Sequence, residues 1–473
     1  MKINPNIFRG YDLRGEVEKD LNPEIVEHLG RGYAAFLNRR GITKAVVGHD
    51  CRATSVEYKD AIIKGLVSSG IDVVDIGLTL TGTLYWSQYF FDSKGGIIVT
   101  ASHNPAEYNG FKFATGFSET MVSDEIQELR KIVEEENYIT VKKEGTVKKQ
   151  NIKQIYIDDI IKRFDLKNKF KIVVDPGNST PGYFIPDLLR AAGMEVIEKN
   201  TNLDPTFPLG TPDPTEKEVA ERISKEVLEA GADLGFSYDA DGDRIGVVDG
   251  NGRILWNDVL VALFAADVIR ENPNAKIVFN TLCSKVVEET IREKGGQPIM
   301  WRTGHSFIKA KAQKEKAKFA GELSGHFFFL DKFYPHDDGA YATMRLLDYL
   351  SSSGVSLAEA VNSLPQYISS PEIKVGCPDD LKVSFIGKIS GVLKKDYPET
   401  EVIDDERAGD GVRLEMNDAM FIVRYSQNGP YLTIKFEAKT EERYNELKRY
   451  INQLLHSYEE VDWKYGVNVE SLG

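Results

Sequence analysis

The chain has 473 residues, of which 41% are hydrophobic and 28% are charged, so wholesale disorder is excluded and about three globular domains are expected. Its 73 acidic residues outnumber its 59 lysines and arginines, and the formal charge of −14 argues against a protein that coats nucleic acid or an anionic membrane. Three cysteines imply no disulfide framework and favour a reducing, cytoplasmic location. The N-terminal segment has no signal-peptide pattern, and no apolar run approaches the length of a membrane span.

The first third of the chain alternates between short apolar runs and segments with helical spacing. The runs at 44–48, 72–76 and 96–100 predict buried strands, and 55–69 predicts a helix. Strand and helix in this order are typical of parallel α/β units. The polar, lysine-rich stretch 142–154 predicts a linker or a solvated edge.

The same alternation recurs twice further along the chain. The second cycle predicts strands at 170–175, 194–198 and 233–238, with helices at 183–192 and 216–230. The third predicts strands at 276–280, 297–301 and within 319–329 around a glycine-containing turn, with helices at 259–270, 284–294, 306–318 and 339–352. The repeated order hints at structural repetition, although the segments share too little sequence to prove it.

After Pro365 the pattern changes. The segments 421–425 and 431–437 predict antiparallel strands, and 441–457 predicts a closing helix. We therefore expect an α/β protein with three similar mixed α/β domains and a smaller C-terminal α+β domain.

A serine lies on a tight loop directly after the third predicted strand. In the segment from Thr100 to Pro105, Ser102 is followed by the imidazole of His103, and Pro105 cannot continue a ladder. Strand ends in α/β folds are where ligands meet the sheet, so Ser102 is a candidate nucleophile or phosphate carrier. The alternative is an ordinary Asn-Pro turn.

Three carboxylates at alternate positions follow the strand at 233–238. Such packing of Asp239, Asp241 and Asp243 is costly unless a cation offsets it, and oxygen ligands suit Mg²⁺ or Ca²⁺. An EF-hand is excluded because Arg244 and Gly250 occupy the positions that need Gly and Glu. A solvated acidic turn is the alternative to a metal site.

A third candidate lies between Gly321 and Gly325. In an extended segment, Glu322, Ser324 and His326 would point to one side, where they would suit vicinal sugar hydroxyls. A loop with a hydrogen-bonded histidine is the alternative.

Two basic segments could bind phosphate. Residues 8–15 contain Arg9 and Arg14 among glycines, and 424–430 combine Arg424 with small polar donors. Surface solvation is the alternative for each.

Together and in this order, these segments resemble the α-D-phosphohexomutase family, and in particular its phosphomannomutase/phosphoglucomutase branch. The resemblance runs from Phe8 to Pro430 and includes three further motifs, namely Asn109-Gly110-Phe111-Lys112, Thr303-Gly304-His305-Ser306 with Ile308-Lys309, and Asp337-Asp338-Gly339. It implies four domains around a central cleft: 1–150 with a phosphoserine loop, 151–253 with a metal loop, 254–366 with a sugar-recognition loop, and a phosphate-binding 367–473.

The resemblance also implies roles for individual residues. The catalytic set is Ser102 as the phosphoserine, with Arg14 and Lys112 beside the transferring phosphoryl group, Lys112 as a proton shuttle and His103 assisting. The Mg²⁺ ligands are Asp239, Asp241, Asp243 and a phosphate oxygen on Ser102. The substrate-binding set is Tyr11, Arg244, Gly304, His305, Glu322, Ser324, His326, Arg424, Ser426, Gln427 and Asn428.

The chain departs from the family pattern at two places. The final loop has Gln427 and Asn428 where relatives usually carry Asn and Thr, and both replacements still donate hydrogen bonds. Leu282 occupies the place of a family lysine, and Lys285 is offset from it by three residues.

The function implied is interconversion of hexose 1-phosphate and hexose 6-phosphate, of mannose or glucose, through a hexose 1,6-bisphosphate that also acts as activator. Sugar phosphates are the expected partners, without nucleic acid or membrane, and the chain is expected to be a monomer or homodimer. The alternatives are a phosphoglucosamine mutase, a metal-dependent phosphatase using Asp239 or Asp241, and a non-catalytic regulator that binds sugar phosphates.

Overall fold

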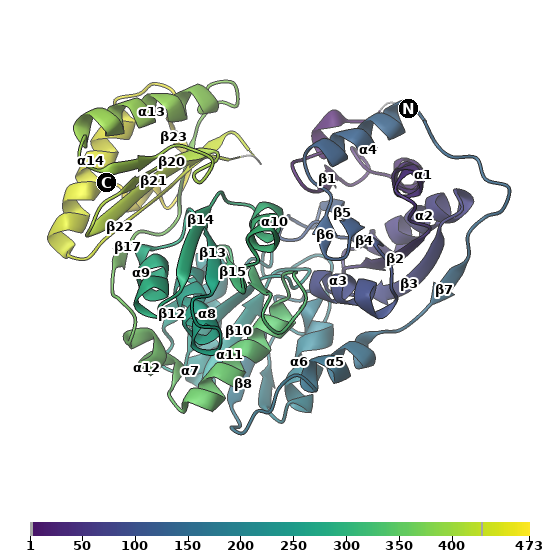
Figure 1. The fold of residues 1–473 in the computed structure, drawn as a ribbon, viewed down its shortest axis with the longest axis horizontal. Coiled ribbons are helices and arrows are strands. Elements are labelled where there is room, and N and C mark those ends of the chain that lie inside the picture. Colours follow the sequence, from purple (N-terminus) through teal and green to yellow (C-terminus); the bar gives the residue numbers. More distant parts are fainter. Residues whose placement is uncertain (1–2, 427–428) are drawn as a thin grey trace. The chain divides into compact units, whose positions relative to one another are not determined.

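The computed structural model describes residues 3–426 and 429–473 and divides into two compact units (Figure 1). Unit 1 comprises Met1–Trp256 and Ser324–Ala358, and unit 2 comprises Asn257–Leu323 and Glu359–Gly473. Helix α12 (Leu357–Asn362) contains the third point at which the chain passes from one unit to the other. Gln427 and Asn428 of the predicted phosphate loop lie outside the described residues.

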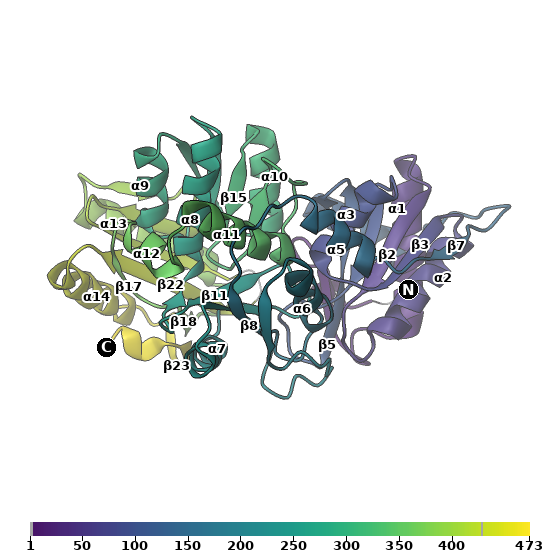
Figure 2. The same cartoon turned by 90° about the horizontal axis from the view of Figure 1, so that it is seen from below.

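The first sheet of unit 1 has the order β1-β5-β4-β2-β3-β7, with β6 beside β5 (Figure 1). Figure 2 shows β2, β3 and β7 next to one another in this sheet. Its strands are β1 (Leu13–Glu16), β2 (Lys44–His49), β3 (Asp72–Leu78), β4 (Gly95–Val99), β5 (Tyr108–Gly116), β6 (Glu119–Thr120) and β7 (Val147–Lys149). The helices around it are α1 (Pro23–Arg39), α2 (Ser55–Ser68), α3 (Thr81–Phe90) and α4 (Asp124–Glu134), after the short η1 (Pro5–Ile7). The exposed edge strand β7 pairs parallel with β3, which confirms the predicted solvated edge.

Alternating side chains make this first sheet the middle of three layers. Val47 and Val99 pack into the core formed with α1, α2 and α4, whereas Val46 and Ile98 pack with Leu84 of α3 on the other face. Successive residues of a strand point to opposite faces, so an unbroken apolar run is buried on both sides.

The second sheet of unit 1 has the order β12-β11-β10-β8-β9. Its strands are β8 (Lys171–Asp175), β9 (Glu195–Glu198), β10 (Leu234–Tyr238), β11 (Ile245–Asp249) and β12 (Ile254–Leu255). The associated helices are α5 (Lys153–Ile161), α6 (Pro181–Ala191), α7 (Lys217–Ala230) and α11 (Gly339–Ser353), and β16 (Phe327–Phe329) precedes α11. Antiparallel pairing of β10 with β11 makes the sheet mixed.

Unit 2 begins with a parallel β14-β13-β15 arrangement. Its strands are β13 (Lys276–Asn280), β14 (Gln297–Trp301) and β15 (Phe319–Gly321), with helices α8 (Asn257–Glu271), α9 (Lys285–Glu293) and α10 (His305–Glu315). The C-terminal sheet has the order β19-β20-β21-β22-β18-β23, with β17 beside β22. These strands are β17 (Ile368–Ser369), β18 (Ile373–Gly376), β19 (Glu401–Ile403), β20 (Gly411–Glu415), β21 (Ala419–Tyr425), β22 (Tyr431–Ala438) and β23 (Asp462–Val467).

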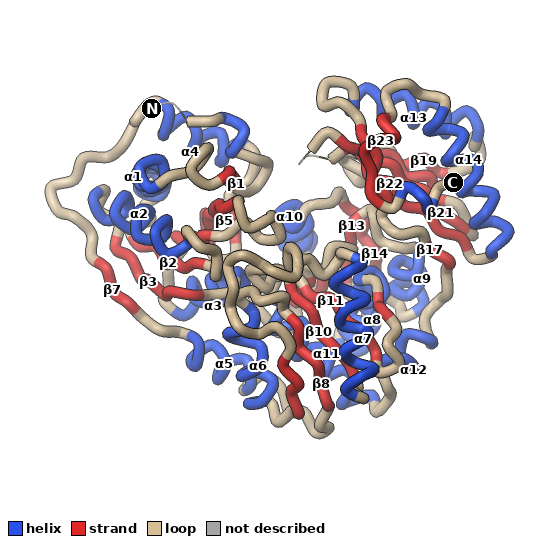
Figure 3. The backbone as a smooth tube through the Cα atoms, turned by 180° about the vertical axis from the view of Figure 1, so that it is seen from behind, coloured by secondary structure: helices blue, strands red, loops and turns tan. Residues whose placement is uncertain are grey.

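Helices α13 (Lys382–Asp396) and α14 (Glu441–His456) cover one face of the C-terminal sheet, and η2 (Val469–Ser471) ends the chain (Figure 3). Val423 and Ile434 point into the core beneath these helices, whereas the adjacent Ile422 and Lys435 point to the opposite face. This one-sided covering is typical of an α+β domain and confirms the antiparallel prediction for this region.

The predicted helices and strands are confirmed, with ends that shift by at most three residues, and β15 and β16 flank the glycine-containing turn predicted within 319–329. The extended alternation predicted for 322–326 is wrong, because these residues form the turn and Gly325 has a φ of 95°. Helices α1, α3, α4, α5, α12 and α13 were not predicted, although Asn22 and Pro23 are a strong start signal for α1 and the Asn22 side chain accepts the amide of Ile25.

Candidate active site

The predicted phosphoserine lies on a buried turn after β4. Ser102 is 3% exposed and has a φ of 48°, a left-handed conformation that is uncommon for serine. Its amide donates to Thr100 Oγ1 at 2.9 Å, and its Oγ donates to Asp239 Oδ2 at 2.9 Å. His103 Nδ1 lies 3.1 Å from the same Oγ. The structure therefore brings the serine, the histidine and one predicted metal ligand together.

The three predicted metal ligands follow β10 and are fully buried. Asp239, Asp241 and Asp243 each offer an oxygen within 4.8 Å of the others. Gly242 between them has a φ of 69°, and a Cβ there would lie 2.8 Å from Leu80 Cδ2, so this turn requires glycine. The alternating positions predicted from the sequence thus converge on one point.

The ammonium group of Lys112 bridges two of these carboxylates. Its Nζ lies 2.8 Å from Asp241 Oδ2 and 2.6 Å from Asp243 Oδ2. Burial would lower the pKa of Lys112, but the adjacent carboxylates outweigh that effect and hold its pKa well above the ordinary value. Lys112 is thus a cation at this position, which suits charge stabilisation, and its role as a proton shuttle stays a prediction.

The acidic residues suit a divalent cation. Asp241 Oδ1 and Asp243 Oδ1 are buried and have no hydrogen-bond donor among residues 3–426 and 429–473. Burial, and then repulsion from Asp241, raise the pKa of Asp243 to about 7, while Lys112 overcomes burial and lowers the pKa of Asp241. Two unpaired buried oxygens beside Asp239 form a donor set of the kind that Mg²⁺ prefers.

Arg244 lies at the end of the same acidic turn. Its Nε donates to Asp239 Oδ2 at 3.1 Å, and its Nη1 donates to Asp213 Oδ1 at 3.2 Å. Burial, followed by the charge of Arg244, holds the pKa of His103 well below its usual value. Arg244 Nη2 is buried without an acceptor within the described part of the chain, so it can still bind an anion. Asp213, which orients Arg244, was not predicted because it lies in the proline-rich loop 204–214.

Arg14 reaches the serine loop from β1. In the antiparallel pair of β1 and β5, Arg14 lies opposite Gly110, two residues before Lys112. Its Nη1 donates to Asn104 Oδ1 at 2.6 Å, and its Nε donates to Asp12 Oδ2 at 2.8 Å. The predicted position beside Ser102 is therefore consistent with the structure. Tyr11 is half-buried three residues earlier in the same segment.

His326 lies beside the acidic turn of unit 1, and its contact with the sugar stays a prediction. Its Nδ1 lies 2.7 Å from Asp337 Oδ2 and 3.7 Å from Asp243 Oδ1, and its backbone forms a bridge with Arg244. The turn after β15 carries the ring away from an extended alternation and towards the acidic turn of unit 1. Ser324 lies in that turn and is half-buried.

Glu322 closes the unit 2 part of the same loop. It is 1% exposed, and its Oε1 accepts the amide of Gly304 at 2.9 Å. Gly304 has a φ of 131° and precedes His305, the buried first residue of α10. Two predicted substrate segments, 303–306 and 321–322, are thus held together within unit 2.

The final predicted phosphate loop starts at the end of β21. Arg424 forms a bidentate pair with Asp410, with its Nε donating to Oδ1 at 2.9 Å and its Nη2 donating to Oδ2 at 2.5 Å. Ser426 is 5% exposed, and its carbonyl accepts from Lys382 Nζ at 2.6 Å. Neither Asp410 nor Lys382 was predicted, since each lies many residues away from the loop in sequence.

Lys285 pairs with a carboxylate of the C-terminal sheet and does not replace the missing family lysine. Its Nζ pairs with Glu415 of β20, and its amide donates to Glu437 Oε1 at 2.7 Å. Leu282 packs against Met420 and Ile422. An apolar contact therefore occupies the position of the family lysine.

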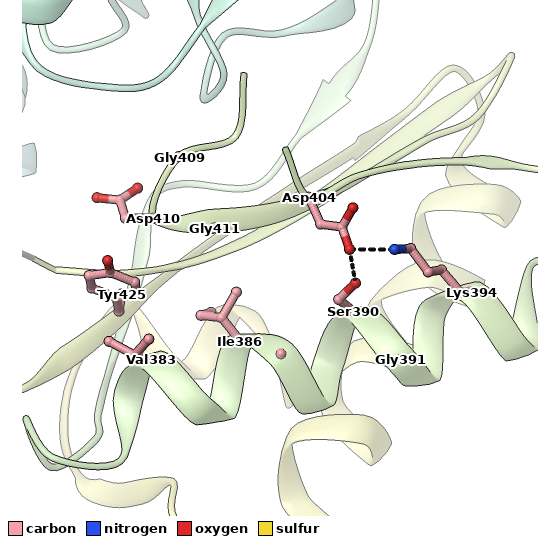
Figure 4. A pocket seen from close by; sticks show the side chains of 11 residues that line it. Val383, Ile386, Ser390, Gly391, Lys394, Asp404, Gly409, Asp410, Gly411 and Tyr425 are labelled. Atoms are coloured by element: carbon pink, nitrogen blue, oxygen red, sulfur yellow. Dashed lines mark hydrogen bonds and ion pairs between the residues drawn. The ribbon is translucent and has the colours of Figure 1, made fainter. Parts of the chain in front are cut away.

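A cavity of about 440 Å³ lies beside the final loop, between α13 and the C-terminal sheet (Figure 4). Asp410 and Tyr425 line one part of it, and in another part Ser390 and Lys394 both bind Asp404. It is open to solvent and lined mostly by small or paired side chains, so it adds no catalytic group.

Comparison with known proteins decides the family. Three models for phosphoglucomutase/phosphomannomutase match consecutive parts of the chain: α/β/α domain I at residues 5–140, domain II at 154–252 and domain III at 256–367. A phosphoglucomutase from Neisseria gonorrhoeae is 35% identical over 461 residues, which cover 98% of this chain and 99% of the relative. The chain belongs to the phosphoglucomutase/phosphomannomutase family.

Other members of this family give the same result. A phosphomannomutase/phosphoglucomutase from Pseudomonas syringae pv. tomato is 37% identical over 92% of each chain. The crystal structure of a family protein from Burkholderia thailandensis has a TM-score of 0.89 at 33% identity and covers 96% of this chain and 98% of that one. The predicted α-D-phosphohexomutase resemblance and the fold of three α/β domains plus a fourth are confirmed, and the chain is an enzyme of the phosphohexomutase class.

Within the described ranges, no helix is both long and apolar enough to cross a bilayer. Cys51, Cys283 and Cys377 are all free thiols.

Proposed function

We propose that this phosphohexomutase interconverts hexose 1-phosphates and hexose 6-phosphates of mannose, glucose or both, with phosphorylated Ser102 as the phosphoryl donor. The observation that carries the proposal is the buried contact of Ser102 Oγ with Asp239, next to two carboxylates that keep unpaired oxygens. A phosphoryl group on Ser102 would enter a site where cationic and acidic groups already surround it. Phosphoryl transfer depends mainly on such positioning and charge stabilisation.

Asp239, Asp241 and Asp243, with a phosphate oxygen on Ser102, would hold one Mg²⁺ ion. When bound, the ion supplies charge neutralisation at the phosphoryl oxygens. Lys112 and Arg14 add positive charge from β5 and β1. Arg244, already oriented by Asp213, offers its remaining guanidinium nitrogen to an anionic substrate.

In the transfer step, the bond between phosphorus and Ser102 Oγ breaks as a sugar hydroxyl oxygen bonds to phosphorus. The hydroxyl proton must move to a base, and the imidazole of His103, 3.1 Å from Ser102 Oγ, is the candidate. The product is a hexose 1,6-bisphosphate, which also primes unphosphorylated enzyme. Transfer of its other phosphoryl group back to Ser102 completes the isomerisation.

The second phosphate and the sugar hydroxyls are assigned to the remaining predicted residues. Arg424 and Ser426 would bind the phosphate that is not transferred, together with Gln427 and Asn428. Glu322 and Ser324 would bind the hydroxyls in either orientation, and Gly304 and His305 would contact the sugar phosphate. Their meeting with Ser102 in a central cleft stays a prediction.

The decisive experiment follows ³²P from labelled enzyme to glucose 6-phosphate and mannose 6-phosphate. We expect label on Ser102 to appear in the bisphosphate, and Ser102→Ala to lose at least ~1000-fold in mutase activity. Ser87→Ala is the matched control, because Ser87 is also buried in unit 1 but donates to the carbonyl of Leu84 in α3. Mutase activity retained in Ser102→Ala would rule out the phosphoserine role.

The alternatives have distinct outcomes in the same assay. A phosphatase would release inorganic phosphate without needing a bisphosphate primer, and a regulator would bind sugar phosphates without turnover. Phosphoglucosamine mutase is not favoured, since a relative so named, the probable enzyme of Pyrococcus abyssi, is 31% identical, below the 35–37% of the relatives named above. A panel of glucose, mannose and glucosamine phosphates tests this directly.

A cytoplasmic location is part of the proposal and is supported by the three free thiols. A monomeric or homodimeric state and independence from nucleic acid stay predictions.

A further inference from the structure

One buried arginine of unit 1 binds the backbone of the serine loop at four points. Arg52 lies between β2 and α2, and its side chain is 1% exposed. Its Nη2 donates to the carbonyls of Ser102 at 2.6 Å and Asn104 at 2.7 Å. Its Nη1 donates to the carbonyls of Pro105 at 2.7 Å and Tyr108 at 3.0 Å. Four acceptors of one seven-residue loop thus converge on a single guanidinium.

The loop needs such an external scaffold because of its own conformation. Ser102 has a φ of 48°, a region that is strained for a non-glycine residue. Buried carbonyls without donors would add a further penalty. By binding these carbonyls, Arg52 holds the turn that points Ser102 Oγ towards Asp239.

Arg52 is itself fixed by neighbouring groups. Asp50 Oδ2 lies 3.2 Å from its Nε, and Asp50 Oδ1 accepts both the Arg52 amide at 3.0 Å and Ser55 Oγ at 2.6 Å. Asn109 Nδ2 then donates to Ser55 Oγ at 3.0 Å. This chain of bonds connects Arg52 to the start of β5, the strand that carries Lys112.

The pairing with Asp50 decides how Arg52 can act. The buried carboxylate neutralises the guanidinium, so the ion pair adds little net charge to the phosphoryl site. The planar fork of arginine supplies several donors in fixed directions, whereas a lysine ammonium is a single nitrogen with three donors. Geometry is therefore the property that Arg52 contributes.

We propose that Arg52 is a positioning residue for phosphoryl transfer. It holds the Ser102 loop so that Ser102 Oγ stays beside Asp239 of the acidic turn. The proposal rests on the proposed function, in that Ser102 is the group that carries the phosphoryl. Displacement of a reacting atom by about 1 Å can slow a reaction roughly 100-fold, so loss of the four-point contact is expected to act on the transfer rate.

The test compares Arg52→Lys and Arg52→Met with Arg345→Met. Arg345 is the matched control, because it is also a buried arginine of unit 1 but pairs with Asp331 at 2.9 Å beside α11. For each variant, transfer of ³²P from Ser102 to glucose 6-phosphate is timed in a single turnover, and KM is measured at steady state. Hydrogen exchange of peptides spanning 100–110 reports the order of the loop.

We expect both Arg52 variants to transfer the label roughly 10- to 100-fold more slowly per labelled site, with KM changed by less than about twofold and faster exchange in 100–110. Lysine should fail to rescue methionine, and Arg345→Met should transfer at the normal rate. Normal transfer in either Arg52 variant, or an equal loss in Arg345→Met, would overturn the inference.

If Arg52→Met does not fold, Arg52→Lys decides alone. If wild-type enzyme carries no label on Ser102, the proposed function fails. In that case, hydrogen exchange in 100–110 alone tests whether Arg52 holds the loop. Exchange that is unchanged in the Arg52 variants then overturns the inference.

Discussion

Two clusters of buried charge differ in how their carboxylates are satisfied. The catalytic cluster of unit 1 consists of Asp239, Asp241, Asp243 and Lys112. The sheet cluster of unit 2 lies on the face of the C-terminal sheet opposite α13 and α14 and consists of Asp258, Lys285, Arg413, Glu415, Lys435 and Glu437.

In the sheet cluster each carboxylate has a specific donor. Lys435 Nζ lies 2.5 Å from Asp258 Oδ2, and Arg413 Nε lies 2.7 Å from Glu415 Oε2. Arg413 also donates to the carbonyls of Thr281 and Cys283 at 2.7 and 2.8 Å. These bonds join β20 and β22 to the segment 281–285, so the cluster fixes structure within unit 2.

In the catalytic cluster one ammonium group is shared by Asp241 and Asp243, Asp239 pairs with Arg244, and two oxygens have no hydrogen-bond donor within the described residues. Unmatched buried charge lowers stability, whereas paired buried charge is roughly neutral. In this protein, the buried charges with incomplete pairing lie at the candidate active site, whereas the fully paired charges hold segments of unit 2 together. Substitutions in the catalytic cluster should therefore lower activity more than stability. Substitutions in the sheet cluster should lower stability more than activity.

The largest expected effect is on activity in the catalytic cluster. Asp243→Asn keeps an oxygen for Lys112 but removes one charge from the proposed metal site, so activity should fall roughly 100-fold or more. Because it also relieves repulsion from Asp241, its melting temperature in metal-free buffer at pH 8 should equal or exceed that of wild type. Differential scanning fluorimetry with and without Mg²⁺ provides the measurement.

Wild type should gain thermal stability on addition of Mg²⁺, and the variant should gain less. Asp249→Asn is the control, since Asp249 is buried at the end of β11 and accepts the amides of Asn251 and Arg253. Equal Mg²⁺ stabilisation of wild type and Asp243→Asn would contradict the metal assignment.

The next largest effect is on stability in the sheet cluster. Lys435→Met leaves Asp258 buried without its cation and should lower the free energy of unfolding by about 3–5 kcal/mol. Activity per folded molecule should stay near wild type, because Lys435 is a residue of unit 2 whereas Ser102, Lys112 and the acidic turn belong to unit 1. Denaturant titration followed by protein fluorescence measures the change in the free energy of unfolding, and an activity assay measures the activity per folded molecule.

Adding Asp258→Asn to Lys435→Met should recover part of the loss, since the amide keeps an acceptor without a charge. Lys439→Met is the control, because Lys439 pairs with Glu289 at the surface, where a pair contributes about 0–1 kcal/mol. A double variant that is less stable than Lys435→Met would show that charge pairing is not the cause.

The smallest expected effect is on the pH dependence of stability. It concerns a half-buried carboxylate that belongs to neither cluster. Burial, and then the charge of Asp175, raise the pKa of Glu226 on α7 from 4.5 to about 7. A carboxyl group whose pKa is raised by folding loses stability as pH rises, here between about 4.5 and 7. Glu226→Gln should remove this part of the pH dependence, with a difference below ~1 kcal/mol because solvent screens the group.

Unfolding free energies at pH 4.5, 6 and 7.5 check this expectation, with Glu229→Gln as the control one turn away on the same helix. A pH dependence that is identical in wild type and Glu226→Gln would contradict it.

Much of the fold was predictable because its signals are local. The apolar run at 44–48 became β2, and the segment 421–425 became part of β21, since strand signals depend only on neighbouring residues. The Ser102 and Asp239 motifs were predictable for the same reason, because a strand followed by a polar turn is a local pattern. The extended alternation predicted for 322–326 was wrong, because Gly325 adopts a left-handed conformation that the alternation of side chains does not reveal.

By itself, the sequence determined the order of strands and helices, the family, and which residues could bind a phosphoryl group or a metal. Tertiary structure alone decided that Arg52 binds the carbonyl of Ser102, fifty residues away, and that Lys112 bridges Asp241 and Asp243. It also paired Lys285 with Glu415 and turned His326 towards Asp337. These contacts join segments far apart in the chain, and their energies depend on burial and distance, which exist only once the sheets have packed.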